Sequence, residues 1–123
     1  MANHPIVHVE IPAKDTKAAG EFYSKLFDWK MQLDEKMNYL MFESVGGPGG
    51  GFTELGGEGN TKPGDVVIYV GTDDIEATTA RAESLGAKVI MPKMEIPMTG
   101  WIAIFEDPTG NKIGLYKAMN PTA

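Results

Sequence analysis

The sequence predicts an α+β fold built from two modules in tandem, each with the order strand–helix–strand–strand–strand. Three observations indicate this organisation. The halves of the chain match when shifted by 59 residues, each half opens on a β-branched strand, and a glycine-rich stretch separates them. An internal match of this length is typical of a repeated structural unit. We place module one at residues 5–55 and module two at residues 65–117 of a single domain.

The first element of each module is a strand. Residues 6–11 (IVHVEI) alternate His8 and Glu10 with β-branched residues, and residues 66–70 (VVIYV) have the same character. Alternation with a period of two and β-branched side chains are typical of strands. We therefore expect His8 and Glu10 on one face of the first strand, and Val9 on the other face beneath a helix.

A helix follows each of these strands. Asp15 precedes apolar residues that recur at intervals of three or four up to Phe27, so we expect this aspartate to cap the first helix. Either Asp73 or Asp74 can cap the second helix, and the sequence leaves both open. Gly86 stands where a glycine commonly ends a helix.

Three further strands complete each module. Residues 40–43 (LMFE) resemble residues 103–106 (AIFE), and residues 49–55 parallel residues 110–116. Glycine favours turns over helix, so the glycine-rich stretch predicts loops around one short strand at Phe52 to Leu55. The following loop, from Gly56 to Gly64, we interpret as the link between the modules.

Two segments of module two carry distinctive residues. Residues 91–101 (MPKMEIPMTGW) contain three methionines, two prolines and a tryptophan. Methionine adapts to irregular apolar shapes, so one interpretation is a loop that covers a ligand. The other interpretation is an edge strand interrupted by prolines. The sequence Asp107-Pro108-Thr109-Gly110 predicts a tight turn.

Composition excludes several classes of protein. The chain has 123 residues, and 17 acidic against 11 basic side chains give a net charge of −6. Such a surface repels phosphate groups, so we expect neither nucleic acid nor membrane as a partner. Without cysteine, disulfides and thiolate ligands are excluded. No apolar run is long enough to span a membrane and no signal peptide is visible, so we expect a cytoplasmic protein.

The chain resembles a known superfamily over nearly its whole length. Residues 8–29 (HVEIPAKDTKAAGEFYSKLFDW), 71–89 (GTDDIEATTARAESLGAKV) and 105–116 (FEDPTGNKIGLY) are similar to the vicinal oxygen chelate superfamily. That group includes lactoylglutathione lyase, extradiol dioxygenases and bleomycin-binding proteins, and the resemblance is closest to a branch of uncharacterised proteins related to lactoylglutathione lyase. It implies glyoxalase-like βαβββ modules that curl into half-barrels of mixed sheet and form a ligand-binding cleft. This fold hosts many reactions and also pure binders, so it implies no single chemistry.

The resemblance also implies where a metal would bind. Members that use a metal hold a divalent ion with four side chains, one from the first strand and one from the fourth strand of each module. Carried onto this chain, those positions fall on His8, Thr53, Val67 and Gly114. His8 is a strong ligand, and Glu10 on the same strand face is a second donor. We therefore expect no resident metal or other cofactor, and the alternative is a divalent Zn, Ni, Mn or Fe ion held by His8 and Glu10.

Seven residues are candidates for a ligand-binding cleft, and no catalytic residue is assigned. They come from the strand faces that share the orientation of His8 and from residues 91–101. They are His8, Glu10, Thr53, Tyr69, Trp101, Lys112 and Tyr116. Polar side chains and tyrosines can orient a small ligand, but Glu10 and Lys112 can equally form a salt bridge, and tyrosines can pack inside a barrel.

The sequence indicates a small-molecule-binding protein of the glyoxalase and bleomycin-resistance type, without the metal site of the family. The alternative is a metal-dependent lyase, isomerase or dioxygenase with an altered ligand set. A third possibility is a metal-free enzyme that uses Glu10 or Tyr116 as a base. Two modules alone would leave a sizeable apolar surface in water, so we expect a homodimer.

Overall fold

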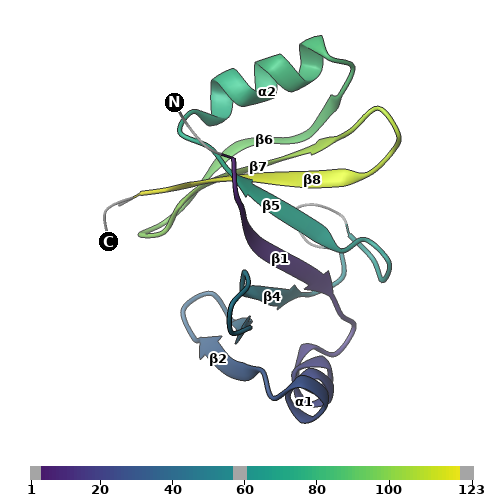
Figure 1. The fold of residues 1–123 in the computed structure, drawn as a ribbon, viewed down its shortest axis with the longest axis vertical. Helices are drawn as coiled ribbons and strands as arrows, with labels where there is room; N and C mark the ends of the chain where they lie inside the picture. Colours follow the sequence, from purple (N-terminus) through teal and green to yellow (C-terminus); the bar gives the residue numbers. More distant parts are fainter. Residues whose placement is uncertain (1–3, 57–60, 120–123) are drawn as a thin grey trace. The chain divides into compact units, whose positions relative to one another are not determined.

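A computed structural model describes residues 4–56 and 61–119 of the chain. The chain divides into two compact units, which we call the first unit (His8–Val67) and the second unit (Met1–Val7 with Ile68–Ala123). Residues 57–60 of the expected link between the modules lie outside the described residues. The mixed α+β class and the βαβββ order are confirmed (Figure 1). None of the helices in the described residues is long and apolar enough to cross a membrane.

The elements follow the order that the repeat predicts. In the first half of the chain they are β1 (Ile6–Pro12), α1 (Thr16–Phe27), β2 (Lys30–Asp34), β3 (Tyr39–Glu43) and β4 (Gly50–Thr53). In the second half they are β5 (Val67–Gly71), α2 (Ile75–Ser84), β6 (Lys88–Ile96), β7 (Gly100–Glu106) and β8 (Lys112–Ala118). β4 begins and ends two residues earlier than the predicted strand from Phe52 to Leu55, because Gly50 and Gly51 join the strand and residues 54–55 do not.

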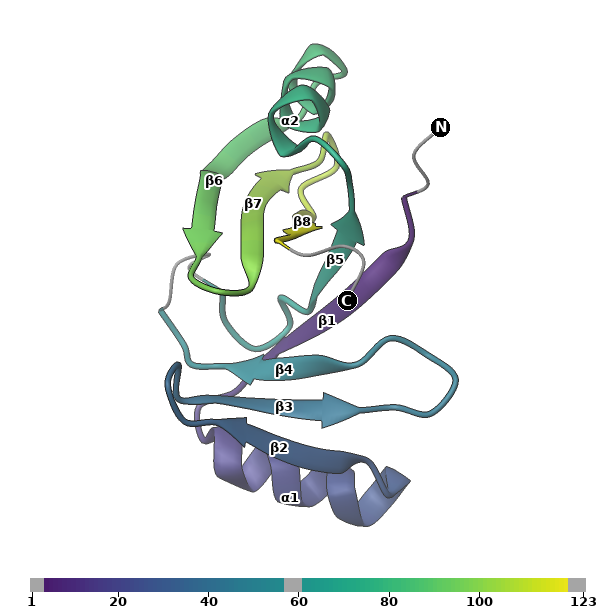
Figure 2. The same ribbon diagram turned by 90° about the vertical axis from the view of Figure 1, so that its left-hand side faces the viewer.

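The first unit is a sheet covered on one face by α1. Its strand order is β2-β3-β4-β1, with β1 and β4 parallel and the other neighbours antiparallel. α1 runs along β2, β3 and β4 (Figure 2). Aromatic rings fill the space beneath the helix: Tyr23 of α1 stacks on Phe52 and Trp29, and Trp29 stacks on Phe42 with ring centroids 4.4 Å apart. Phe42 and Phe52 are the buried members of this stack, and Tyr23 and Trp29 are half-buried over them.

The second unit repeats this construction. Its strand order is β5-β8-β7-β6, again with one parallel pair, β5 with β8. The core consists of Ile75 at the start of α2, Ala103 of β7 and Leu115 of β8, all nearly fully buried. α2 therefore covers one face of its sheet in the way that α1 does in the first unit.

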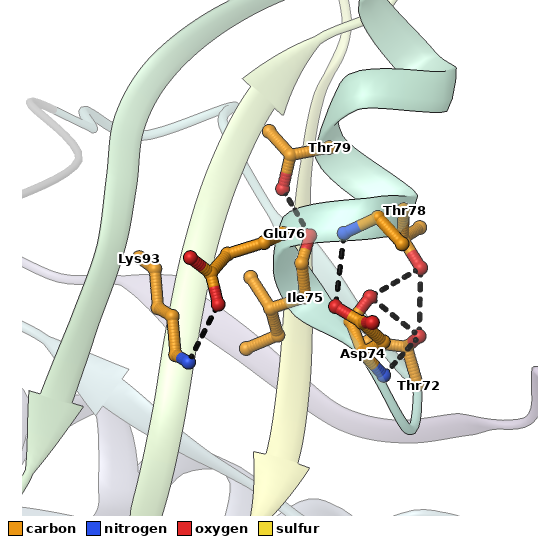
Figure 3. A network of polar contacts seen from close by, with 8 residues as sticks. Thr72, Asp74, Ile75, Glu76, Thr78, Thr79 and Lys93 are labelled. Atoms are coloured by element: carbon orange, nitrogen blue, oxygen red, sulfur yellow. Dashed lines mark hydrogen bonds and ion pairs between the residues drawn. The ribbon is translucent and has the colours of Figure 1, made fainter.

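Both helices begin at an aspartate. The Oδ1 of Asp15 accepts a hydrogen bond from the backbone N–H of Ala18, and the Oδ1 of Asp74 accepts one from Ala77. Asp74, rather than Asp73, is thus the cap of α2. The hydroxyls of Thr72 and Thr78 form a hydrogen bond with each other, 2.7 Å long, beside this cap (Figure 3). The hydrogen bonds to Asp15 and Asp74 satisfy backbone N–H groups that the first turn of a helix leaves without partners.

The segment 91–101 contains an edge strand rather than a covering loop. β6 extends to Ile96 and stands at the end of the strand order of the second unit. Its register with β7 shifts between Val89 and Met91 and again before Met94, around Pro92. Proline cannot donate to a sheet ladder, which explains an irregularity at this point.

The tight turn between β7 and β8 forms at the predicted residues. The N–H of Gly110 donates to the carbonyl of Asp107 at 3.0 Å, and Gly110 has a φ of +98°. The carboxylate of Asp107 also accepts from the N–H groups of Thr109 and Asn111. These hydrogen bonds lower the pKa of Asp107, because they favour the charged carboxylate.

Candidate functional site

His8 and Glu10 lie on the sheet face of the first unit that is turned away from α1. In the ladder between β1 and β4, Glu10 is the partner of Gly51 and Ile11 is the partner of Phe52. Phe52 packs against Tyr23 of α1, so Ile11 shares the helix-covered face. Since side chains alternate along a strand, His8 and Glu10 occupy the opposite face, as the alternation in the sequence predicts.

The hydroxyl of Tyr39 joins His8 and Glu10. Tyr39 Oη lies 2.8 Å from Nε2 of His8 and donates to Oε2 of Glu10 at 2.9 Å. The His8 and Tyr39 rings are stacked, with centroids 6.1 Å apart. All three side chains are half-buried. We call this group the His8–Tyr39–Glu10 chain.

Hydrogen-bond chemistry sets the direction of the His8–Tyr39–Glu10 chain. An ionised carboxylate only accepts, so Tyr39 gives its one hydroxyl proton to Glu10. The bond between Tyr39 and His8 must then be donated by the Nε2–H of the imidazole. Burial lowers the pKa of His8 below 6.5, which favours the neutral ring at neutral pH.

Tyr39 reaches across β4 because Gly51 has no side chain. β4 lies between β3 and β1 in the sheet, and Gly51 is the residue opposite Glu10. A Cβ atom added to Gly51 would overlap the phenol ring of Tyr39. Sequence reasoning missed Tyr39. The signal that could have found it has two parts. One is a glycine in β4 on the same face as His8, and the other is a tyrosine in β3, two residues before the ladder partner of that glycine.

The second unit places a tyrosine over a glycine in the same way. Tyr69 of β5 is the ladder partner of Gly114 of β8, and a Cβ atom at Gly114 would overlap the ring of Tyr69. Lys112 and Tyr116 lie two residues before and after Gly114 in β8, so their side chains share the face of Tyr69. The structure thus groups three of the predicted residues on one face of the second unit: Tyr69, Lys112 and Tyr116.

The hydroxyl of Tyr116 is poorly suited to the role of a base. It donates to the carbonyl of Thr99 at 3.2 Å, and burial raises the pKa of Tyr116 above 10.0. A raised pKa makes the phenolate harder to form, whereas a base near neutral pH needs a lowered one.

Trp101 lies on the other face of the second unit. Trp101 packs against the core formed by Ile75, Ala103 and Leu115, beneath α2. Lys93 and Lys117 hold their ammonium groups 5.4 and 5.8 Å from the centre of its ring, and Lys93 also pairs with Glu76 of α2 (Figure 3). The structure therefore does not group Trp101 with Tyr69 and Tyr116, and its contacts give it a packing role.

Thr53 shares a face with Tyr39 but is not the counterpart of Gly114. Glu10 and Tyr69 correspond by the shift of 59 residues, and their ladder partners are Gly51 and Gly114. The alignment by sequence, which matched Thr53 with Gly114, is therefore displaced by two residues. The ladders match Thr53 with Tyr116 instead. Glycine-rich strands are prone to such displacement, because they carry few side chains that mark a face.

The corrected positions do not fit the four-ligand metal site of the superfamily. They hold His8, Gly51, Val67 and Gly114, so His8 is the one strong donor among the four. The rings of Tyr39 and Tyr69 occupy the space into which side chains at Gly51 and Gly114 would project. Within the described residues, no group of three or more His, Cys, Asp or Glu side chains could hold a metal ion. A first-row ion is usually held by three or four protein donors.

The chain belongs to the Glyoxalase/Bleomycin resistance protein/Dioxygenase superfamily, whose family model matches residues 5–115. This match agrees with the paired βαβββ units. The superfamily includes enzymes and binding proteins, so membership alone does not select a reaction.

Known proteins similar to this chain span several roles. The anthracycline biosynthesis protein DnrV of Streptomyces peucetius is 27% identical over 88% of this chain and 45% of its own length. A putative glyoxylase, CFP32, of Mycobacterium bovis is 27% identical over 89% of this chain and 44% of its own length. The chain therefore spans about half the length of these relatives. A solved methylmalonyl-CoA epimerase variant of Streptomyces coelicolor, in complex with 2-nitronate-propionyl-CoA, is 19% identical with a TM-score of 0.65, covering 94% of this chain and 97% of the other.

Proposed function

We propose that this protein binds a small organic molecule and does so without a resident metal ion, as a binding member of its superfamily. The observation that carries the proposal is the pair of tyrosine rings over Gly51 and Gly114. At both fourth-strand positions where the metal-using relatives place a ligand, this chain has a glycine covered by an aromatic ring. A ligand side chain introduced there would first have to displace that ring.

His8 and Glu10 are the two donors on β1 that could still bind an ion, and both are hydrogen-bonded to the hydroxyl of Tyr39. An ion bound to Nε2 of His8 would have to break its 2.8 Å contact with Tyr39 Oη. An ion bound to Oε2 of Glu10 would have to break the 2.9 Å bond from the same hydroxyl. Two donors and water make a weak site for a first-row ion, so metal bound there would be lost on dialysis.

The polar face of the first unit is the part of the molecule that we assign to the ligand. It combines a carboxylate, an imidazole and a phenol, which orient small molecules through hydrogen bonds and ring contacts. The name of one relative places it in anthracycline biosynthesis. An aromatic compound is therefore a suitable first class of ligand to test.

Elemental analysis tests the metal-free part of this proposal. Untagged protein is expressed with added Zn, Ni, Mn or Fe, dialysed, and analysed beside a His8→Ala variant. We expect far less than one equivalent of metal per chain in both proteins. Near one equivalent in the native protein, lost in His8→Ala, would show a metal site and favour the metal-dependent lyase, isomerase or dioxygenase. Binding is measured separately, by calorimetric titration with aromatic compounds.

A further inference from the structure

One side of α1 exposes apolar side chains in a row. Phe22 and Leu26 have 58% and 57% of their surface accessible, and Ala18 is exposed as well. These residues follow one another at intervals of four, so they lie along one side of the 12-residue helix, and we call them the exposed stripe of α1. A different side, which carries Tyr23, packs on the sheet. α1 therefore has two apolar sides, whereas a helix at a protein surface usually has one.

The ring in the middle of the exposed stripe is held in place by the interior of the first unit. Phe22 meets Tyr23 edge to face, with ring centroids 5.0 Å apart, and Tyr23 stacks on Phe52, which is 1% exposed. A side chain that is already ordered loses little conformational freedom when it binds, and ordered aromatic side chains are common anchors of protein–protein contacts. The exposed stripe is thus a preformed apolar surface.

The charged residues beside the exposed stripe match a second copy of the same helix. Glu21 and Lys25 are exposed and lie one turn apart along the same edge of the stripe. In residues 4–56 and 61–119, neither of them takes part in an ion pair. If two copies of α1 cross antiparallel about a two-fold axis near Phe22, Glu21 of each copy lies beside Lys25 of the other copy. A parallel pair would instead place like charges side by side.

The sizes of the apolar side chains fit the same antiparallel arrangement. Phe22 of one copy meets Phe22 of the other at the axis, and at both ends the small Ala18 faces the larger Leu26. Rows of side chains spaced by four residues are the ridges that interdigitate in the commonest class of helix packing. Apolar side chains and charges therefore both make this surface self-complementary, as a two-fold contact requires.

We propose that the exposed stripe of α1 is a self-association surface, on which α1 of a second copy of this chain packs antiparallel across a two-fold axis near Phe22. His8 lies on the opposite face of the sheet from α1, since Phe52 and Ile11 share the helix-covered face. Association through α1 does not use the face that we assign to the ligand, so either proposal can fail without the other.

Substitutions in the exposed stripe test the surface by sedimentation equilibrium of the untagged chain. We expect a dimer that Phe22→Lys weakens about tenfold or more, as the loss of a central aromatic anchor usually does. Leu85→Lys is the matched control, because Leu85 is 63% exposed in the second unit, and it should leave the dissociation constant unchanged. Unfolding in urea shows whether the variants are folded. Leu26→Lys, whose side chain is equally exposed, replaces Phe22→Lys if that variant does not fold.

Charge reversal tests the antiparallel orientation. Glu21→Lys alone and Lys25→Glu alone each set like charges against one another between the copies, and each should weaken dimerisation about fivefold. A mixture of these two variants should form a mixed dimer as tight as the native one, because both contacts between the copies again join opposite charges. Each variant chain keeps like charges at positions 21 and 25, so recovery on mixing cannot arise within one helix.

Four results would overturn the proposal. They are a native protein that stays monomeric at high micromolar concentration, an unchanged dissociation constant in the folded stripe variant, an equal loss in Leu85→Lys, and no recovery in the mixture. A monomer would leave the exposed stripe to a different partner, and an unchanged dimer would have its interface elsewhere. The metal content of the dialysed protein, which tests the proposed function, is independent of all four results.

Discussion

The phenol ring of Tyr39 on β3 stands where a side chain of Gly51 on β4 would project. This relationship lets the Tyr39 hydroxyl reach Glu10 and His8 on β1, one strand beyond β4. The absence of a side chain at one position therefore determines the contacts of three others.

We expect Gly51→Ala to destabilise the protein by about 1–3 kcal/mol, the usual cost of forcing an extra methyl group into a packed site. The added Cβ overlaps the ring of Tyr39, so the cost should shrink in a Tyr39→Ala background. The free energies of unfolding of the native protein, both single variants and the double variant are measured in urea. Gly47→Ala is the control, because its Cβ would meet only the hydroxyl of Ser44, at 3.1 Å. Additive effects of the two substitutions would contradict the overlap.

Acid should weaken the folded state through His8. Its pKa is lowered from 6.5 by burial, so the unfolded chain binds the proton more readily than the folded one. Stability that His8 contributes is therefore complete above about pH 6.5 and falls as the pH drops toward the lower pKa of the folded state. In His8→Gln, which cannot titrate, unfolding free energies between pH 5 and pH 8 should vary less. An equal pH dependence in both proteins would rule out this contribution.

The cap of α2 should be specific to one of two neighbouring aspartates. Asp74 accepts a hydrogen bond from the N–H of Ala77 at 2.9 Å, so Asp74→Ala should cost about 1 kcal/mol, the typical value of an N-cap. Asp73→Ala should change stability by no more than about 0.5 kcal/mol, as exposed substitutions usually do. Thermal unfolding of both variants gives the comparison. Equal losses in the two variants would show that the cap is shared.

We expect the chain to form a homodimer. Large apolar side chains are exposed in the described residues, among them Phe22 and Leu26 of α1 with 58% and 57% of their surface accessible. Apolar surface of this kind commonly marks contacts between proteins. Light scattering at micromolar concentration should give twice the 13.3 kDa mass of one chain, and a mass of one chain would reject the dimer.

Most of the fold could be predicted because nearly every element carries a local signal in the sequence. Alternating β-branched residues indicate β1 and β5, and Asp15 and Gly86 mark the beginning of α1 and the end of α2. The strand containing residues 50–53 could be placed only approximately. Its glycines provide no alternation of polar and apolar side chains, so the sequence alone misplaced both its start and its repeat partner.

The sequence predicted only the part of the site that lies on a single strand. His8 and Glu10 share a face because they are two residues apart on β1. Tyr39 was missed because its contact with them depends on the order and register of three strands. Trp101 was grouped with the candidate residues by its place in the chain, but the ladder with β8 sets it on the helix-covered face.

The irregular edge strand β6 has a consequence for association in crowded solution. A regular edge strand offers a continuous row of backbone donors and acceptors, which can recruit a strand from another molecule and start aggregation. β6 interrupts that row, since its register shifts twice, Pro92 has no N–H to offer, and Lys88 and Lys93 place charge along it. The edge of the second unit is therefore a poor template for pairing with a strand of another molecule, which disfavours aggregation at high protein concentration.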